Sequence, residues 1–244
     1  VECNNKIGVA IQVQADACEI TNCDIRNLYQ PANQWKAIGI EVRFEGNDWS
    51  ILVANNVFDT INAVGDSTGS NGVGLSRAVV LSATADVTKT SIVANNIITS
   101  VIGEEGDSVV VISSNGAGTY YDFPVLIANN AITTWTRRGV KTQSNKAVVK
   151  NNTFRNTFTS NPGNLQHAVS LVQGGDHVVD GNVFINCRYA GQVVAIAASA
   201  GERVDNITVT NNVITDIGAE TTNVPIYLKT FGENVVVTGN KILC

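Results

Sequence analysis

The chain has 244 residues and a formal net charge of −5 at pH 7, which is length enough for one large domain or two small ones. The acidic balance and the lack of a basic run argue against a nucleic-acid partner, because nothing would neutralise phosphates. No apolar stretch reaches the roughly eighteen residues of a membrane span. The five cysteines show neither CxxC spacing nor an even-numbered disulfide framework, and they predict no metal site.

A short motif with two asparagines recurs along the chain, as in "ILVANNVF" (51–58) and "SIVANNII" (91–98). The second position of the pair is occupied by Asn5, Cys23, Asn56, Asn96, Asn130, Asn152, Asn182, Asn212 and Asn240. The spacing runs from 18 residues, between Asn5 and Cys23, to 40 residues, between Asn56 and Asn96. A period of roughly twenty to fifty residues is typical of repeat proteins.

Each motif follows a run that alternates apolar and polar residues, and a second alternating run lies upstream of it. In chain order the upstream runs cover residues 8–13, 39–44, 78–83, 109–114, 139–144, 168–173, 193–198 and 225–230. No unit has room for a long amphipathic helix, so each is predicted to be strand, turn, strand and variable loop. One such unit cannot bury its apolar face alone, whereas stacked units can, with equivalent positions roughly 4.8 Å apart.

The repeat therefore predicts an all-β fold, a parallel β-helix of about nine coils that spans residues 1–244 as a single domain. Asparagine tolerates left-handed backbone angles, so the pair can turn the chain at a corner of each coil. Its amide can also bond to the equivalent amide of the next coil, which predicts an asparagine ladder. Gly181 and Gly239 replace the first asparagine, as a corner with unusual backbone angles would permit.

The upstream run of each coil has an outward face that can be read from its alternation. The outward residues are predicted to be Ala10, Gln12, Glu41, Arg43, Val80, Ser82, Val111, Ser113, Lys141, Gln143, Ser170, Val172, Ala195, Ala197, Tyr227 and Lys229. This face is mostly small and neutral, and Glu41, Arg43 and Lys141 are its charged exceptions in the first two thirds of the chain.

Aromatic residues gather in the insertions between coils, and Tyr29, Trp35 and Trp135 are the main examples. Exposed aromatic faces suit sugar rings, which present apolar C–H patches beside hydroxyls. These three residues, with Glu41 and Arg43, are the candidate carbohydrate-binding set. The competing interpretation is that each ring packs its own loop against the rod.

The sequence offers little for a glycoside hydrolase with a carboxylate pair, which needs two acids roughly 5 to 9.5 Å apart. The outward face carries one acid, Glu41, so a partner would have to come from a loop. The densest acidic cluster is "GEEGD" (103–107), which a solvated loop explains equally well. Its spacing matches no calcium-binding loop, so no cofactor and no metal site are predicted.

The repeated coils resemble the right-handed parallel β-helices of pectate-lyase-like proteins, which include polysaccharide lyases, polygalacturonases and phage tailspikes. A narrower likeness covers "GVKTQSNKAVVKNNTFRN" (139–156), which is similar to the segment of chondroitinase-B-type and alginate lyases with the catalytic lysine. The resemblance implies that Lys141 removes the proton beside a uronic carboxylate, and Arg138 or His167 would assist. The family's arginine in the next coil is replaced here by Val172 or Gln173.

The expected function is that of an extracellular or virion-surface β-helix that binds a polysaccharide, of tailspike, depolymerase or polysaccharide lyase type. Whether it also degrades the polysaccharide is left open by the sequence. The alternative is a structural shaft, adhesin or filament subunit without chemistry. The sequence predicts no amphipathic capping helix at either end, and without a cap the end of a solenoid exposes open strand edges. We therefore expect a segment of a longer chain, with ends covered by flanking domains or by a homo-oligomer, which the resemblance suggests is a trimer.

Overall fold

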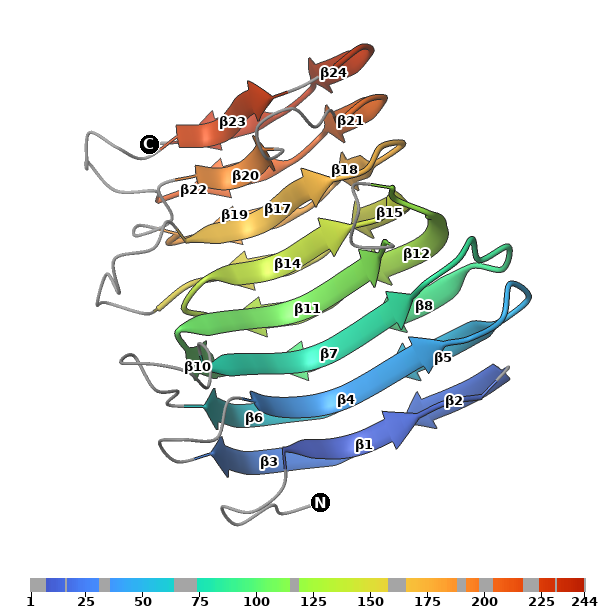
Figure 1. Ribbon diagram of the computed structural model, residues 1–244. Helices are drawn as coiled ribbons and strands as arrows, with labels where there is room; N and C mark the ends of the chain where they lie inside the picture. Colours follow the sequence, from blue (N-terminus) through green and yellow to red (C-terminus); the bar gives the residue numbers. More distant parts are fainter. Residues whose placement is uncertain are drawn as a thin grey trace.

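The computed structural model describes residues 8–15, 17–30, 36–63, 74–114, 119–157, 166–187, 192–197, 204–216, 224–230 and 232–243. The described residues form strands and connecting turns that stack as successive turns of a β-solenoid (Figure 1). They contain no helix long and apolar enough to cross a membrane. The described part of the chain forms fewer coils than the nine expected, and the motif at Asn5 lies outside it.

Three parallel sheets run along the stack, and each coil contributes one strand or more to them. Sheet 1 is β1 (Val9–Val13), β4 (Lys36–Phe44), β7 (Leu75–Ala83), β11 (Glu105–Ser113), β14 (Arg138–Gln143), β17 (His167–Gln173), β20 (Gln192–Ala197) and β23 (Val224–Thr230). Sheet 2 is β2 (Ala17–Thr21), β5 (Ser50–Ala54), β8 (Ser91–Ala94), β12 (Asp122–Ala128), β15 (Asn145–Lys150), β18 (Val178–Asp180), β21 (Ile207–Thr210) and β24 (Val235–Thr238). Sheet 3 is β3 (Asp24–Gln30), β6 (Val57–Ala63), β9 (Ile97–Ile98), β10 (Val101–Gly103), β13 (Ala131–Thr133), β16 (Thr153–Arg155), β19 (Val183–Ile185), β22 (Val213–Thr215) and β25 (Lys241–Leu243).

The second asparagine of each motif forms the predicted ladder. From Asn56 to Asn240, each side-chain Nδ2 donates to Oδ1 of the next asparagine at 2.8 to 3.0 Å. Each backbone N–H donates to the same Oδ1 at 2.9 to 3.0 Å. Cys23 begins the series, because its backbone N–H donates to Oδ1 of Asn56 at 2.9 Å. The ladder satisfies buried amides that would otherwise cost free energy.

The first residue of each pair has the left-handed backbone that the corner requires. The φ angle is 58° at Asn55, 57° at Asn95 and 56° at Asn129. Gly181 and Gly239 take the same place with φ of 65° and 66°, so their substitution for asparagine follows from the backbone angle. The two asparagines therefore have separate roles: one turns the chain and the other bonds along the stack.

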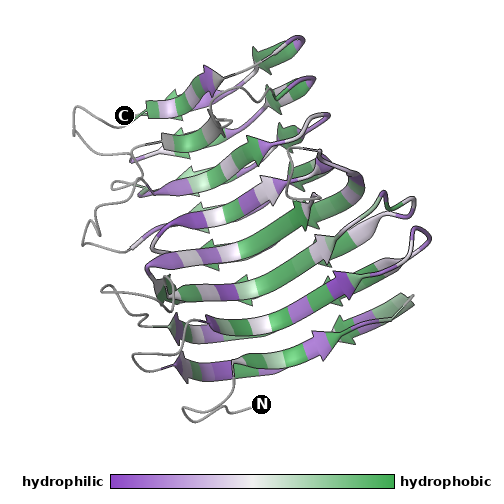
Figure 2. Ribbon diagram, in the orientation of Figure 1, coloured by the Kyte–Doolittle hydropathy of each residue, from purple (hydrophilic) through white to green (hydrophobic). Residues whose placement is uncertain are grey.

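Inward residues of the three sheets form the core. Figure 2 shows apolar segments of neighbouring strands in line with one another along the stack. In sheet 3, residues Phe58, Ile98, Ile132, Phe154 and Phe184 follow one another in register. Phe154 and Phe184 are stacked, with ring centroids 5.0 Å apart and planes 12° apart. Such columns are the packing that a single coil cannot provide.

Candidate functional site

Strand β14 places Arg138 and Lys141 on the same outward face, with two consecutive buried residues between them. Gly139 and Val140 are both buried, whereas Arg138 and Lys141 are half-buried. Position 139 needs glycine, since a Cβ there would lie 2.6 Å from the carbonyl oxygen of Ala168. The predicted outward position of Lys141 is therefore confirmed, with Arg138 three residues before it.

The register of sheet 1 brings charged residues from neighbouring coils beside β14. Arg77, Asp107, Arg138 and His167 follow one another in one column. Val80, Val110, Lys141 and Ser170 form a second column. We call the following group the Lys141 cluster: Arg77, Glu105, Asp107, Arg137, Arg138, Lys141 and His167. It unites Lys141, Arg138 and His167, the three candidate catalytic residues.

The outward face differs from the prediction in the first coil, where Ala10 packs against the main core, and in the coil of β11. Val110 and Ile112, not Val111 and Ser113, share register with the outward residues Val80 and Ser82. Val111 and Ser113 are buried on the inward side. The alternation predicts the wrong phase here because "VVVISS" begins with three valines, all of them buried.

Ion pairs hold the arginines of the Lys141 cluster in place. Nη1 of Arg138 lies 3.3 Å from both carboxylate oxygens of Asp107, whose side chain is completely buried. Glu105 pairs with Arg137, and its Oε2 lies 3.8 Å from Nη2 of Arg77. Within the described part of the chain, the Nε–H groups of Arg77 and Arg138 are buried and have no acceptor. Unsatisfied donors of this kind favour the binding of an anion.

Lys141 has the most perturbed acid–base chemistry of the cluster. Burial is the main cause that lowers its pKa from 10.5 to about 8, and Arg138, Arg77 and Arg137 lower it further against the opposing effect of Asp107. Burial likewise lowers the pKa of Arg137 to about 10, which leaves that guanidinium charged at neutral pH. A lysine with a lowered pKa can act as a base, which an ordinary solvated lysine does poorly.

The cluster is a positive patch on an acidic protein. Arg77, Arg137, Arg138 and Lys141 outnumber the carboxylates of Glu105 and Asp107 by two, and Glu104, which also acts on Arg137, reduces the excess to one. Its aliphatic neighbours Val80 and Val110 are buried, so the charges lie beside an apolar surface. Such a surface attracts anions more strongly than an open one, because water screens it less.

Glu41 and Arg43 lie on the same sheet but outside this cluster. Glu41 shares the column of Lys141 three strands away, which is roughly 14 Å at the spacing of stacked strands. Its carboxylate accepts hydrogen bonds from Arg43 at 3.1 Å, Gln12 at 3.4 Å and Lys36 at 3.5 Å. The carboxylate of Glu41 is therefore already bonded to three side chains of the protein.

Of the aromatic candidates, the two that the structure describes, Tyr29 and Trp135, do not belong to the Lys141 cluster. The expectation that Trp135 is an exposed loop ring is wrong: its side chain is completely buried and packs edge-on against Phe154, with ring centroids 6.2 Å apart. Tyr29 is half-buried in β3, in sheet 3. Trp35 lies outside the described residues.

Sequence reasoning missed Arg77 and Asp107 as neighbours of Lys141. They come from two earlier coils, and only the register across loops of unequal length brings them together. Trp49, in the short turn between β4 and β5, was also left out of the candidate carbohydrate-binding set. In the described ranges, no group of three or more His, Cys, Asp or Glu side chains is arranged to hold a metal ion.

Comparisons with protein-family models, with curated protein sequences and with solved structures find no match to this chain.

Proposed function

We propose that this β-solenoid is a pectate-lyase-like protein that binds an acidic polysaccharide on the outward face of sheet 1, around Lys141. The observation that carries the proposal is a half-buried lysine with a pKa of about 8 among three arginines. Uronate polymers are the substrate class with the matching chemistry, since each unit offers a carboxylate and an acidic C–H bond beside it. Such polymers place the protein outside the cell or on a virion surface.

The proposed reaction is β-elimination at a uronate unit. Neutral Lys141 takes the proton from the carbon beside the carboxylate, and the arginines stabilise the negative charge that develops on the carboxylate. The electron pair of the broken C–H bond forms a C=C double bond, and the glycosidic C–O bond breaks. The departing oxygen takes a proton, with Arg138 or His167 assisting.

The pKa of Lys141 sets the expected pH dependence. With a pKa of about 8, about a tenth of the side chains are neutral at pH 7 and most are neutral at pH 9. Elimination should therefore speed up roughly tenfold between these pH values, until another group titrates.

The test is the ultraviolet absorbance of the unsaturated product on incubation with polygalacturonate, alginate and chondroitin sulfate at pH 7 to 9. Lys141→Met should abolish the signal. Lys229→Met, which changes an exposed lysine of β23 in the same sheet, is the matched control and should retain it. The absence of a signal with all three polymers, or equal rates in the two variants, contradicts the lyase proposal.

The second candidate is a shaft, adhesin or filament subunit without chemistry. It is favoured by a column of half-buried aliphatic residues on the outward face of sheet 2, a surface suited to other copies of the chain. The column is Leu52, Ile92, Leu126, Val148 and Val178. The family's arginine is also replaced, by Val172 or by Gln173, the latter opposite Gln143. Sedimentation distinguishes the two proposals. An assembly that Leu126→Lys dissociates supports the shaft, whereas a monomer that catalyses β-elimination of uronate polymers contradicts it.

A further inference from the structure

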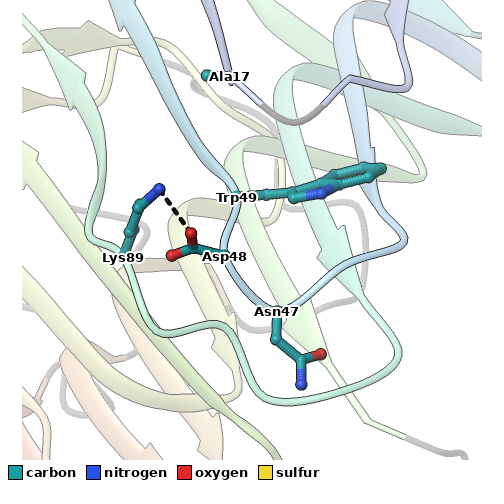
Figure 3. A pocket seen from close by; sticks show the side chains of 5 residues that line it. All are labelled: Ala17, Asn47, Asp48, Trp49 and Lys89. Atoms are coloured by element: carbon teal, nitrogen blue, oxygen red, sulfur yellow. Dashed lines mark ion pairs between the residues drawn. The ribbon is translucent and has the colours of Figure 1, made fainter.

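A cavity of about 460 Å³ lies where the chain passes from sheet 1 to sheet 2 (Figure 3). Its lining residues are Ala17, Asn47, Asp48, Trp49 and Lys89. Asn47, Asp48 and Trp49 belong to the turn that joins β4 to β5, and Lys89 to the turn that joins β7 to β8. The walls therefore come from equivalent turns of two neighbouring coils and from Ala17, at the start of β2 in the coil before them.

Several contacts fix the two turns against each other. The backbone N–H of Thr88 donates to the carbonyl oxygen of Asn47 at 2.7 Å, and its hydroxyl donates to the same oxygen at 3.0 Å. The Thr88 hydroxyl also lies 3.3 Å from Oδ1 of Asp48. Nζ of Lys89 lies 2.9 Å from Oδ2 of Asp48, the ion pair drawn in Figure 3. A pocket held in this way binds with less loss of conformational entropy.

The indole of Trp49 is anchored from behind. It packs against Phe44, with ring centroids 6.2 Å apart, and Phe44 packs edge-on against Phe123 at 4.8 Å. Gly46 lies directly beneath the ring, since a Cβ there would be 2.4 Å from Nε1 of Trp49. The ring is half-buried and keeps a surface toward the cavity. The side chain is thus a fixed aromatic wall.

The polar lining supplies both donors and acceptors. The hydrogen bond from Lys89 holds the pKa of Asp48 below its usual range, so the carboxylate is ionised at neutral pH. The side chains of Asp48 and Lys89 are 74% and 55% exposed, which leaves their remaining hydrogen-bonding positions open to a ligand. A second hollow of about 180 Å³ shares Ala17 and continues over Cys18, Leu52 and Ile92 of sheet 2.

We propose that this pocket binds one neutral pyranose unit of a glycan, with the C–H face of the sugar against Trp49 and its hydroxyls bonded to Asp48 and Lys89. A fixed aromatic face beside a few polar groups is the combination that sugar rings require. The hollow over sheet 2 takes the adjoining unit of the chain. The ion pair neutralises the charge of the pocket, which favours a neutral sugar over a uronate.

The proposal deepens the proposed function, on which it rests for the ligand class alone. The pocket lies in the coils of β5 and β8, whereas Lys141 lies in β14, two to three strands further, roughly 10 to 14 Å along the stack. A glycan site here would hold the polymer at a sugar unit that is not cleaved.

The test is a titration of the whole chain, followed by the NMR signals of the indole N–H groups. The probes are glucose, galactose, mannose and N-acetylglucosamine, with sorbitol as the polyol control. Trp49→Phe identifies the signal of Trp49. We expect that signal to shift saturably with at least one sugar, with millimolar affinity for a single unit, and not with sorbitol.

Variants separate the pocket from a surface effect. Lys89→Met should weaken sugar binding at least fivefold and leaves the packing of Trp49 on Phe44 intact. Lys150→Met is the matched control, since Lys150 also pairs with an aspartate, Asp180, at 3.2 Å on sheet 2, and it should change nothing. The proposal is overturned if no sugar shifts the Trp49 signal, if sorbitol shifts it equally, or if Lys89→Met binds sugars as the natural chain does.

Failure of the proposed function gives a different result. Lys141→Met should leave the shift of the Trp49 signal unchanged. Sugar binding at Trp49 without elimination of any uronate polymer removes the lyase and keeps the pocket. Elimination without sugar binding removes the pocket and keeps the lyase.

Discussion

Nη1 of Arg138 lies 3.3 Å from both carboxylate oxygens of Asp107, and the Asp107 side chain is completely buried. The pair joins β14 to β11, so the same contact that fixes the arginine beside Lys141 also links two coils. A buried ion pair need not stabilise a fold more than apolar residues would, but the loss of one partner leaves the other charge uncompensated.

Asp107→Asn should therefore destabilise the chain by about 3 kcal/mol or more, measured by urea unfolding. The matched control is Asp122→Asn, which removes a carboxylate that pairs with Lys146 at the surface. That change should cost about 1 kcal/mol or less. Equal losses in the two variants would contradict the assignment of Asp107 as the buried partner.

Lys141→Met should stabilise the protein at pH 7, because burial and the three arginines disfavour the charged amine. The expected gain is about 1 to 3 kcal/mol, since each pKa unit corresponds to ~1.4 kcal/mol. The folded pKa of about 8 lies below the unfolded value of 10.5, so between these pH values the unfolded chain holds more protons. The stability of the natural chain therefore rises with pH across this window, and the gain from the substitution disappears.

Urea unfolding of the two proteins at pH 7 and pH 10 measures this difference, in which other titrating groups cancel. A loss of stability in Lys141→Met at pH 7 would show that the amine makes favourable contacts that outweigh its burial. A gain of equal size at both pH values would mean that titration of Lys141 plays no part.

The sequence predicted the ladder because its chemistry is local and repeated. An amide at Asn96 needs a partner at strand spacing, and the same two letters recur wherever the coil turns. A run without polar residues does not show which of its side chains face outward. In "VVVISS" nothing distinguishes Val110 from Val111, and only the register with β7 shows that Val110 faces outward.

The candidate site was predictable only in part, for a related reason. Lys141, Arg138 and His167 could be found because they belong to one coil and the start of the next. Asp107 is 31 residues before Arg138, and its place beside that arginine follows from the register across an intervening loop. Trp135 was predicted to be exposed because it lies in a loop. Its ring is completely buried instead, directly after Thr134, whose φ is 57°.

Asn130→Ala should be among the most damaging changes in the ladder. Oδ1 of Asn130 accepts from the backbone N–H of Asn96 at 3.0 Å and from its Nδ2 at 2.9 Å. Its own Nδ2 donates to Val93 and to Asn152, each at 2.9 Å. Alanine leaves these buried groups without partners, at roughly 1 to 3 kcal/mol each, so a total of at least about 3 kcal/mol is expected.

The neighbouring Asn129 provides the control for this prediction. It is exposed, and its φ of 56° suits glycine, which the chain itself uses at Gly181 and Gly239. Asn129→Gly should change the free energy of unfolding by about 0.5 kcal/mol or less. If Asn129→Gly costs as much as Asn130→Ala in thermal or urea unfolding, the two asparagines do not have the separate roles described above.

His177 should make the stability of the solenoid depend on acid. Its ring is completely buried, Nδ1 accepts the N–H of Ala147 at 3.2 Å, and Nε2 lies 3.3 Å from the carbonyl oxygen of Gln173. Burial lowers its pKa from 6.5 to about 4. In this window the unfolded chain binds the proton first, so stability falls as the pH drops from 6.5 toward 4. The full loss is about 3 kcal/mol at ~1.4 kcal/mol per pKa unit.

The measurement is the free energy of unfolding of the natural chain and of His177→Gln at pH 7.5 and pH 4.5. Glutamine lowers stability at pH 7.5, because it cannot reproduce both ring contacts, but it does not titrate. The gap between the two proteins should therefore narrow by about 2 kcal/mol at pH 4.5, where the unfolded histidine is charged. The carboxylates titrate in both proteins and cancel in the comparison. A gap that stays constant would mean that the histidine is protonated as readily in the folded core as in the unfolded chain. That result would overturn the lowered pKa that follows from its complete burial.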